Sequence, residues 1–467
     1  MTDIVKCGGG TLDSMEKIQR IIDQWGIFDD NVVFIASANG GTTNRIKDAI
    51  RHAENGGSVD PEAVFEGFEH IYRLLPSRSR PLLDSRRDSI YNEFRRMPQN
   101  MPPRSDRNNH RSYTACRHLE GETLSAALFD GILRESGHDS EFVDLRQSPL
   151  AVSGDCHNAR IDLSESRKKA SAMREKNSHR IIVLPGYGGV DRDTGALKTL
   201  GRNGSDTAAS GYLYSFGADR MWMITNVRGI LTINDEHVGE TVPQLDTDET
   251  KDAAVLAAKL PGRRAVHGIE RYFIEGGMPE IYVTRWDNIG GPKTRIVYQE
   301  GQKTPVKLVA GRDMILYLIE GDIKGLQNML YDSGMEYVVF LQEDYALLAV
   351  PDVDSDTEPY ADGALNNLFS SRKRGHVSTR KYAGFSLVGA VGNGMNSLDD
   401  LENGGSVGIL DRGSHAIRKR DIPIAFGHDM GKVSIGYILK RRSNDGSRDY
   451  GMEAQRALYD EFRPGKK

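Results

Sequence analysis

The chain has 467 residues, and its 61 Lys and Arg against 66 Asp and Glu give a formal net charge of −5, which argues against a protein whose main partner is nucleic acid. Apolar runs stay shorter than the roughly 18 residues that cross a bilayer, and three cysteines are too few for a disulfide framework. We therefore expect a cytoplasmic protein of about three domains, with no leader before the first apolar segment at Ile4.

The first forty residues predict a strand, a loop, a helix and a second strand. Residues 3–6 form a short apolar strand, and a run of three glycines, 8–10, follows it. Thr11 is placed to cap the helix, and residues 31–36 are almost continuously apolar, as expected when both faces of a sheet are covered. Strands that alternate with helices predict an α/β domain with a mainly parallel sheet.

Residues 77–111 interrupt this alternation with nine Arg, four acidic residues and four Pro. We interpret the segment as an exposed insertion that is helical near 88–96. A solvated excursion, a cover over an anionic ligand, an oligomer contact and an RNA-binding segment all stay open as interpretations, although few aromatic residues are interleaved as RNA binding requires.

The alternation resumes at Gly121 with a helix. The further predicted elements up to about residue 300 are strands at 180–185, 221–225 and 281–283 and helices at 205–218 and 248–260. These elements complete a predicted catalytic domain over residues 1–300.

The last third predicts two small α+β modules. The first, 301–351, has strands at 305–310, 314–319, 337–341 and 346–350 and a helix at 323–333. A polar linker or insertion occupies 352–381. The second module, 382–467, has strands at 385–391 and 433–438 and ends in a helix at 452–462. Two such units in tandem form a weak internal repeat.

The glycine run places backbone N–H groups and a helix N-terminus at the carboxyl end of a strand, where an anion is favoured. Lys6 adds a positive charge there. The run lacks the Gly-Lys-Ser/Thr ending of a nucleotide P-loop and does not match the dinucleotide Gly-x-Gly-x-x-Gly pattern. Taken alone, it is either a phosphate-binding loop or a plain turn.

Residues 201–206, Gly-Arg-Asn-Gly-Ser-Asp, precede another predicted helix. Arg202 is suited to clamp a carboxylate, Ser205 to hold an anionic oxygen, and Asp206 to accept from an ammonium group or orient Lys6. A capped helix with an incidental Arg is the alternative. Glu122 is similarly either a first-turn helical Glu or a partner for a substrate ammonium.

Four segments, in this order, resemble the amino-acid kinase superfamily and specifically aspartate kinase. The family's Lys-Phe-Gly-Gly-Thr-Ser, Ser-Ala-x-x-Gly-x-Thr-Asn and Gly-Glu-x-x-Ser elements resemble residues 6–11, 37–44 and 121–125. Its Thr-Leu-Gly-Arg-Gly-Gly-Ser-Asp signature is kept at seven of eight positions in 199–206. The two C-terminal modules resemble the family's ACT modules, which bind regulatory amino acids.

The resemblance implies the fold and the reaction. The fold would be a three-layer, carbamate-kinase-like sandwich with a mainly parallel sheet, followed by two βαββαβ ACT-type modules. The reaction would transfer a phosphoryl group from ATP, with Mg²⁺, to the side-chain carboxylate of L-aspartate, giving 4-phospho-L-aspartate for lysine, threonine or methionine synthesis. A homodimer or larger assembly and a regulatory amino acid are also implied.

The resemblance also assigns the site residues. Lys6 would act on the transferred phosphoryl group with the amides of Gly8 and Gly9, and Asp206 would organise the site. The residues that would hold aspartate are Thr43, Glu122, Arg202 and Ser205. The residues that would contact the nucleotide, besides Lys6, Gly8 and Gly9, are Thr225, Asn226, Gly229, Leu231 and Arg264. The resemblance implies no metal ligand in the chain itself.

The nucleotide segment departs from the family pattern. Asn226 replaces the family's Asp, Leu231 its Tyr, Glu236 its phosphate-facing Arg, and Arg264 a later Lys. The segments expected to bind aspartate therefore match the family pattern, whereas the segment expected to bind ATP differs from it. Two alternatives follow: a kinase of another amino-acid carboxylate, or a catalytically weakened amino-acid-sensing protein that binds a partner subunit.

Overall fold

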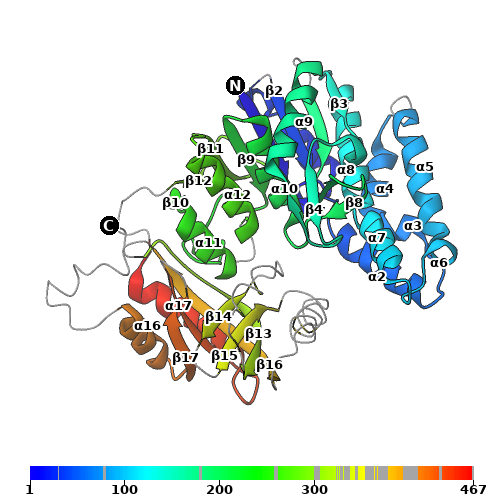
Figure 1. Ribbon diagram of the computed structural model, residues 1–467. Coiled ribbons are helices and arrows are strands. Elements are labelled where there is room, and N and C mark those ends of the chain that lie inside the picture. The colour runs from blue at the N-terminus through cyan, green and yellow to red at the C-terminus, as the bar shows by residue number, and fades with distance from the viewer. Residues whose placement is uncertain are drawn as a thin grey trace. The chain divides into compact units, whose positions relative to one another are not determined.

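The computed structural model divides into two compact units (Figure 1). The first comprises 1–229 and 264–296, and the second comprises 230–263 and 297–467. The structure describes residues 1–29, 31–76, 80–177, 181–256, 261–298, 306–321, 323, 326, 330, 337–341, 345–352, 362, 365, 377–392, 409–430 and 434–464.

A mainly parallel sheet forms the centre of the first unit. Its strands follow the order β12-β11-β9-β1-β2-β6-β3, and only β12 is antiparallel to its neighbour among the strand pairs described there. The strand bounds are β1 Thr2–Cys7, β2 Asn31–Ala36, β3 Ser140–Phe142, β6 Ile181–Pro185, β9 Arg220–Thr225, β11 Glu280–Arg285 and β12 Lys293–Val297. The predicted α/β class is confirmed.

Helices cover both faces of this sheet. Val5 and Phe34 point into a core with α1 and α8. Their neighbours in the two strands, Ile4 and Ile35, are buried on the other face, where α10 packs against β1 and β2. Alternate side chains of a strand point to opposite faces, so burial at every position requires two helical layers. The helices are α1 Met15–Ile22, α2 Thr42–Glu54, α8 Glu120–Glu135, α9 Leu163–Lys176, α10 Gly204–Phe216 and α12 Arg263–Ile274.

The predicted cap of the first helix is wrong. Thr11 ends a short 3-10 turn, Gly9–Thr11, in which its hydroxyl donates to the Gly8 carbonyl at 2.7 Å. The α-helix begins at Met15, and Ser14 is its cap, accepting from the Lys17 N–H.

The Arg-rich segment is helical, and the helix predicted near 88–96 lies within α5, but one face of that helix is buried, so the segment is only partly exposed. Its helices, with the two that precede them, are α3 Pro61–Val64, α4 Glu66–Leu74, α5 Pro81–Arg95, α6 Met97–Asn100 and α7 Arg107–His118. Tyr91 and Phe94 are fully buried in the same core as Phe34. Arg87, one turn before Tyr91, stacks over the Tyr91 ring at 4.5 Å and lies 2.6 Å from the buried carboxylate of Glu69, which also accepts from the Tyr91 hydroxyl. The helix therefore buries an apolar stripe and holds two of its guanidinium groups, those of Arg86 and Arg87, in ion pairs.

A small second sheet, β5-β4-β7-β8, completes the first unit. Its strands are β4 Ala151–Gly154, β5 Ala159–Ile161, β7 Gly188–Asp191 and β8 Leu197–Thr199. Strand β8 ends at Thr199, where the 199–206 signature begins, so this sheet positions the signature at the start of α10.

The second unit is built on an antiparallel sheet of order β14-β15-β13-β16-β18-β17. Its strands are β13 Leu308–Glu320, β14 Val338–Leu341, β15 Tyr345–Pro351, β16 Ser378–Val391, β17 Ile424–Asp429 and β18 Ser434–Lys440. The two strands predicted at 305–310 and 314–319 are one strand, β13. Most of the helix predicted at 323–333 lies outside the described residues, and β16 begins inside the predicted linker.

Helices pack on both faces of this antiparallel sheet. Val388 and Ala390 join the core formed with α16 Ile409–Arg418 and α17 Tyr450–Phe462. Gly389, between them, lies against Leu256 at the end of α11 Thr247–Leu256, which follows β10 Gln244–Asp246. This antiparallel sheet with helices fits the expected ACT-like modules. Within the described part of the chain, no helix has the length and hydropathy to span a bilayer.

Candidate active site

The predicted catalytic residues gather at the carboxyl ends of the parallel strands. Lys6 is next to last in β1, the 37–44 loop follows β2, and Gly186 follows β6. Open parallel sheets bind ligands at this edge. The fold therefore brings segments from distant parts of the sequence to one end of the first unit.

Lys6 and Asp206 form an ion pair, with Lys6 Nζ 2.6 Å from Asp206 Oδ1. Their side chains are only 13% and 14% exposed. Asp206 lies in the first turn of α10, and Lys6 Nζ also lies beside Gly8, 3.8 Å from where a Cβ on that glycine would stand. The carboxylate thus fixes the ammonium group at the glycine run, as the sequence suggested for Asp206.

The three glycines contact two other segments, the 37–44 loop and the end of β9. The Gly8 N–H donates to the Ile224 carbonyl at 3.1 Å, so this amide is already used within the sheet. A Cβ on Gly9 would stand 2.3 Å from the Ala38 carbonyl oxygen, and one on Gly10 would stand 2.6 Å from Asn226 Nδ2. The contact at Gly9 is with backbone and permits only glycine, whereas the contact at Gly10 is with a side chain. The expectation that the Gly8 amide holds phosphate is therefore not supported by its geometry.

The 37–44 loop is locked to the start of α8 by buried polar groups. The Asn39 N–H donates to Ser125 Oγ at 2.9 Å, while the Ser125 hydroxyl donates back to Asn39 Oδ1. The Asn39 amide also donates to the Leu12 carbonyl. A Cβ on Gly121 would stand 2.9 Å from Ala38 Cβ. Thr43, in the first turn of α2, is thereby held beside this junction.

The sequence predicts no role for Asn39 or Ser125, although both lie in the segments that carry the resemblance. Their hydrogen bonds join residues 86 positions apart. The run of small residues after β2 is a sequence signal for a functional loop, but it does not indicate that Asn39 bonds to Ser125.

Glu122 is a buried carboxyl group, 2% exposed, in the first turn of α8. Its Oε2 atom has no hydrogen-bond partner among the residues that the structure describes. Burial raises the pKa of Glu122 to about 8, although the backbone N–H groups of Glu122 and Ala38 oppose the shift. A buried carboxyl group left half-satisfied is suited to receive a cationic group from a ligand.

The 199–206 signature forms a tight turn into α10. Gly201 and Asn203 have left-handed backbones, with φ values of 75° and 54°. A Cβ on Gly204 would stand 2.5 Å from the Tyr187 ring, and one on Gly186 would stand 2.9 Å from Ser205 Cβ. These contacts fix the turn against the ends of β6 and β7, while the Arg202 side chain is exposed to solvent.

The residues predicted to contact the nucleotide range from buried to exposed. Thr225 ends β9, and Asn226 is exposed. Gly229, with φ 115°, is the last residue of the first unit before the chain enters the second, to which Leu231 belongs. The Arg264 guanidinium group bonds to backbone carbonyl groups of the first unit.

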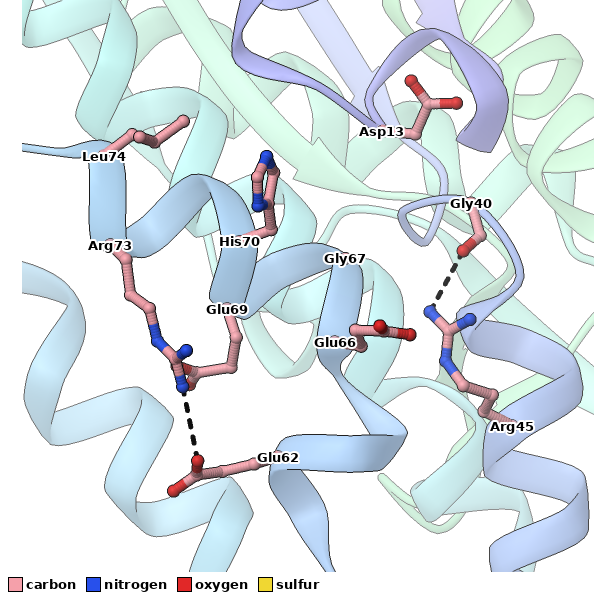
Figure 2. A pocket seen from close by; sticks show the side chains of 10 residues that line it. All are labelled: Asp13, Gly40, Arg45, Glu62, Glu66, Gly67, Glu69, His70, Arg73 and Leu74. Carbon is pink, nitrogen blue, oxygen red and sulfur yellow. Dashed lines mark hydrogen bonds and ion pairs between the residues drawn. The ribbon is translucent and has the colours of Figure 1, made fainter.

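A cavity of about 540 Å³ opens beside the 37–44 loop (Figure 2). Its lining residues are Asp13, Gly40, Arg45, Glu62, Glu66, Gly67, Glu69, His70, Arg73 and Leu74. Figure 2 shows Arg45 turned to the Gly40 carbonyl and Arg73 turned to Glu62. Four carboxylates against two guanidinium groups would repel a polyphosphate, so this cavity is not the nucleotide site. In the described part of the chain, no three His, Cys, Asp or Glu side chains cluster as metal ligands.

Comparison with known proteins decides the family. The amino acid kinase family matches residues 1–282, more than half of the chain. The chain belongs to the amino acid kinase family. Among curated relatives, the aspartokinases of Mycobacterium bovis and Bacillus sp. are 31% and 29% identical over 169 and 156 residues. These matches cover 35% and 33% of this chain and 39% and 37% of those proteins, so they span less than half of either.

The solved structures extend the likeness of fold to the whole chain. A crystal structure of E. coli aspartokinase III in complex with aspartate and ADP superposes with a TM-score of 0.74 at 18% identity, over 98% of both chains. The form of the same E. coli protein with lysine and aspartate gives a TM-score of 0.65 over the same shares. At this identity the likeness establishes the fold of this amino acid kinase, including the fold of the predicted C-terminal modules.

Proposed function

We propose that this amino acid kinase transfers the γ-phosphoryl group of MgATP to the side-chain carboxylate of L-aspartate. The observation that carries the proposal is the buried, half-satisfied carboxyl group of Glu122, at the strand ends that also hold the Lys6–Asp206 pair. A site with one buried carboxyl group and an exposed guanidinium on a fixed turn suits an amino acid, which carries both charges. The fold shared with the E. coli enzyme solved with aspartate and ADP supports this choice.

The amino acid would be held by its two charged ends. Glu122 would receive the ammonium group and Arg202 would clamp the α-carboxylate, with hydroxyl contacts from Thr43 and Ser205. The side-chain carboxylate would then be left free to react. Because a carboxylate is ionised near neutral pH, it needs no general base.

Phosphoryl transfer would rest on position and charge. A carboxylate oxygen of aspartate attacks the γ-phosphorus, the bond to the β,γ-bridging oxygen breaks, and ADP leaves with that oxygen. Lys6, held by Asp206 at 2.6 Å, would stabilise the charge on the transferred group. Mg²⁺ would enter on the phosphate oxygens of the nucleotide, as is usual for this ion. Gly9, Thr225, Asn226, Gly229 and Leu231 stay proposed nucleotide contacts.

The second unit would carry regulation. Its antiparallel sheet and helices suit amino-acid-binding modules, and we propose a regulatory amino acid there and a homodimer or larger assembly. Glu236 is exposed where the family carries a cation, and this observation favours a second candidate, a weakened kinase that senses amino acids for a partner subunit.

The test is a hydroxylamine trap with purified protein, MgATP and L-aspartate, in parallel with other amino acids that bear side-chain carboxylates. The proposal predicts aspartyl hydroxamate from the wild type and none from Lys6→Ala. Product with another amino acid alone would redirect the substrate assignment. No product from any amino acid, with no ATP binding, would favour the sensor.

A further inference from the structure

We infer that Arg264 is a positioning residue for the amino-acid half of the site, where it fixes the turn that carries Arg202, and that it is not a phosphate-binding group. The inference deepens the proposed function and rests on it. It also departs from the role that the family resemblance assigned to this position.

The Arg264 guanidinium group joins two segments of the first unit. Nη1 donates to the Leu200 carbonyl at 2.9 Å and to Asn158 Oδ1, and Nη2 donates to the Ala159 carbonyl at 2.9 Å. Leu200 is fully buried and directly precedes Gly201 and Arg202. Fixing the Leu200 carbonyl therefore fixes the peptide plane from which the turn departs.

Asn158 contacts the same turn from the β4–β5 connection. Its Oδ1 atom lies 2.7 Å from where a Cβ on Gly201 would stand, so it packs directly on that glycine. The neighbouring residue of the signature, Thr199, is held by the same connection. Its N–H donates to the Cys156 carbonyl and its hydroxyl to the His157 carbonyl, at 2.9 and 2.8 Å. We call Arg264 and Asn158 the Arg264–Asn158 bracket.

The geometry explains why an arginine suits this place. A guanidinium group offers donors from separate nitrogens in a rigid plane, and here two of those nitrogens serve three acceptors. A lysine carries the same charge on one atom and would not reproduce this fork. The two side chains therefore separate a bracket, which needs the fork, from a phosphate contact, which needs only the charge.

The experiment measures KM for L-aspartate and for MgATP in the wild type, Arg264→Gln and Arg264→Lys. Both variants are expected to raise KM for aspartate about 10-fold or more and to leave KM for ATP within about 2-fold, because a displaced turn misplaces Arg202. Arg271→Gln is the matched control, since Arg271 is an exposed residue of the same helix that pairs with Glu275. It should leave both constants unchanged.

Three results would overturn the inference. The first is a rise in KM for ATP alone in the Arg264 variants. The second is wild-type behaviour of Arg264→Lys, and the third is no change in either constant. If Arg264→Gln does not fold, Asn158→Ala removes one member of the bracket without losing a charge. It should weaken L-aspartate binding about 3- to 10-fold by calorimetry, a measurement that needs no turnover, and unchanged affinity would reject the bracket.

Failure of the proposed function is recognised separately. It would appear in the wild type, as absence of aspartyl hydroxamate and of aspartate binding, and the inference would fall with it. A wild type that binds aspartate and makes product, with variants that do the same equally well, would reject the bracket alone.

Discussion

The two halves of the proposed site differ in how they are built. In the amino-acid half, buried groups from distant segments interlock: Asn39 bonds to Ser125, Gly121 packs against Ala38, and Glu122 is 2% exposed. In the nucleotide segment, Asn226 is an exposed side chain. The chain there also passes from the first compact unit to the second after residue 229.

This difference explains why one half matches the family pattern and the other departs from it. A substitution at Gly121 would drive a Cβ into packed side chains, and loss of Ser125 would leave buried polar groups unpaired. A substitution at an exposed position such as Asn226 or Glu236 opens no cavity in the core. Packing therefore constrains the buried positions of the first half more strongly than the exposed positions of the second.

The largest effect is expected for Lys6→Ala. Losing the cation that Asp206 holds at 2.6 Å should lower kcat by about 10³-fold, because the transferred group loses its charge stabilisation. The hydroxamate assay measures the rate, and circular dichroism checks the fold. Lys168→Ala is the control, since Lys168 is 74% exposed on α9. Retained activity in Lys6→Ala would refute the phosphoryl role.

Arg202→Ala should act on aspartate more than on ATP. Loss of a charge-assisted clamp is expected to raise KM for aspartate about 30-fold with little change in KM for ATP. Arg192→Ala is a comparison variant, because Arg192 is also exposed and pairs with Asp162 away from the signature turn. An unchanged aspartate KM would remove Arg202 from the amino-acid half.

Glu122 should make aspartate binding depend on pH. With a pKa near 8, the carboxyl group is mostly protonated at pH 6–7, whereas an ammonium ligand prefers the ionised form. KM for aspartate should therefore fall as pH rises from 6 to 8, by up to about 10-fold per pH unit. Glu122→Gln should bind aspartate weakly and without this slope.

The neighbouring Glu120 supplies the control for that pH series. Glu120 lies on the same helix but pairs with Arg117 at 3.7 Å, so Glu120→Gln should keep the wild-type slope.

The raised pKa of Glu122 also costs stability as pH rises, because the unfolded carboxyl group ionises near 4.5 and the folded one near 8. Thermal unfolding of the wild type should therefore lose stability between about pH 5 and 8, and Glu122→Gln should lose less.

The smallest effect is expected in the nucleotide half. Glu236→Arg restores the cation of the family pattern at an exposed position and should lower KM for ATP about 3-fold, with aspartate KM unchanged. The gain should shrink at high salt, because exposed charges are screened. No change in ATP KM at low salt would mean that Glu236 does not correspond to the family's arginine.

The sequence predicts much of the fold because several elements have strong local patterns. Residues 31–36 are almost continuously apolar and form β2 with those bounds, and the helix predicted at 205–218 is observed as α10, Gly204–Phe216. The Arg-rich segment misleads, because Tyr91 and Phe94 supply a buried stripe among many charges. The sequence predicts two strands where β13 is one, because Gly311, Arg312 and Asp313 interrupt its apolar pattern. In the structure these three residues pair with β16.

The candidate site is only partly predictable for a related reason. The approach of Lys6 to Asp206 follows from motifs that the sequence displays. The bonds of Asn39 to Ser125 and of Arg264 to Asn158 join residues 86 and 106 positions apart, and nothing local signals them. Such long-range polar contacts depend on how the whole chain folds, so they are visible only in three dimensions.

The most direct test of the contrast between the halves is calorimetric titration of L-aspartate into the wild type without nucleotide, in two buffers of different ionisation enthalpy at pH 7. A preformed amino-acid half predicts binding by the protein alone, with a heat that depends on the buffer because Glu122 releases a proton. Absence of aspartate binding until MgATP or MgADP is added would contradict the account.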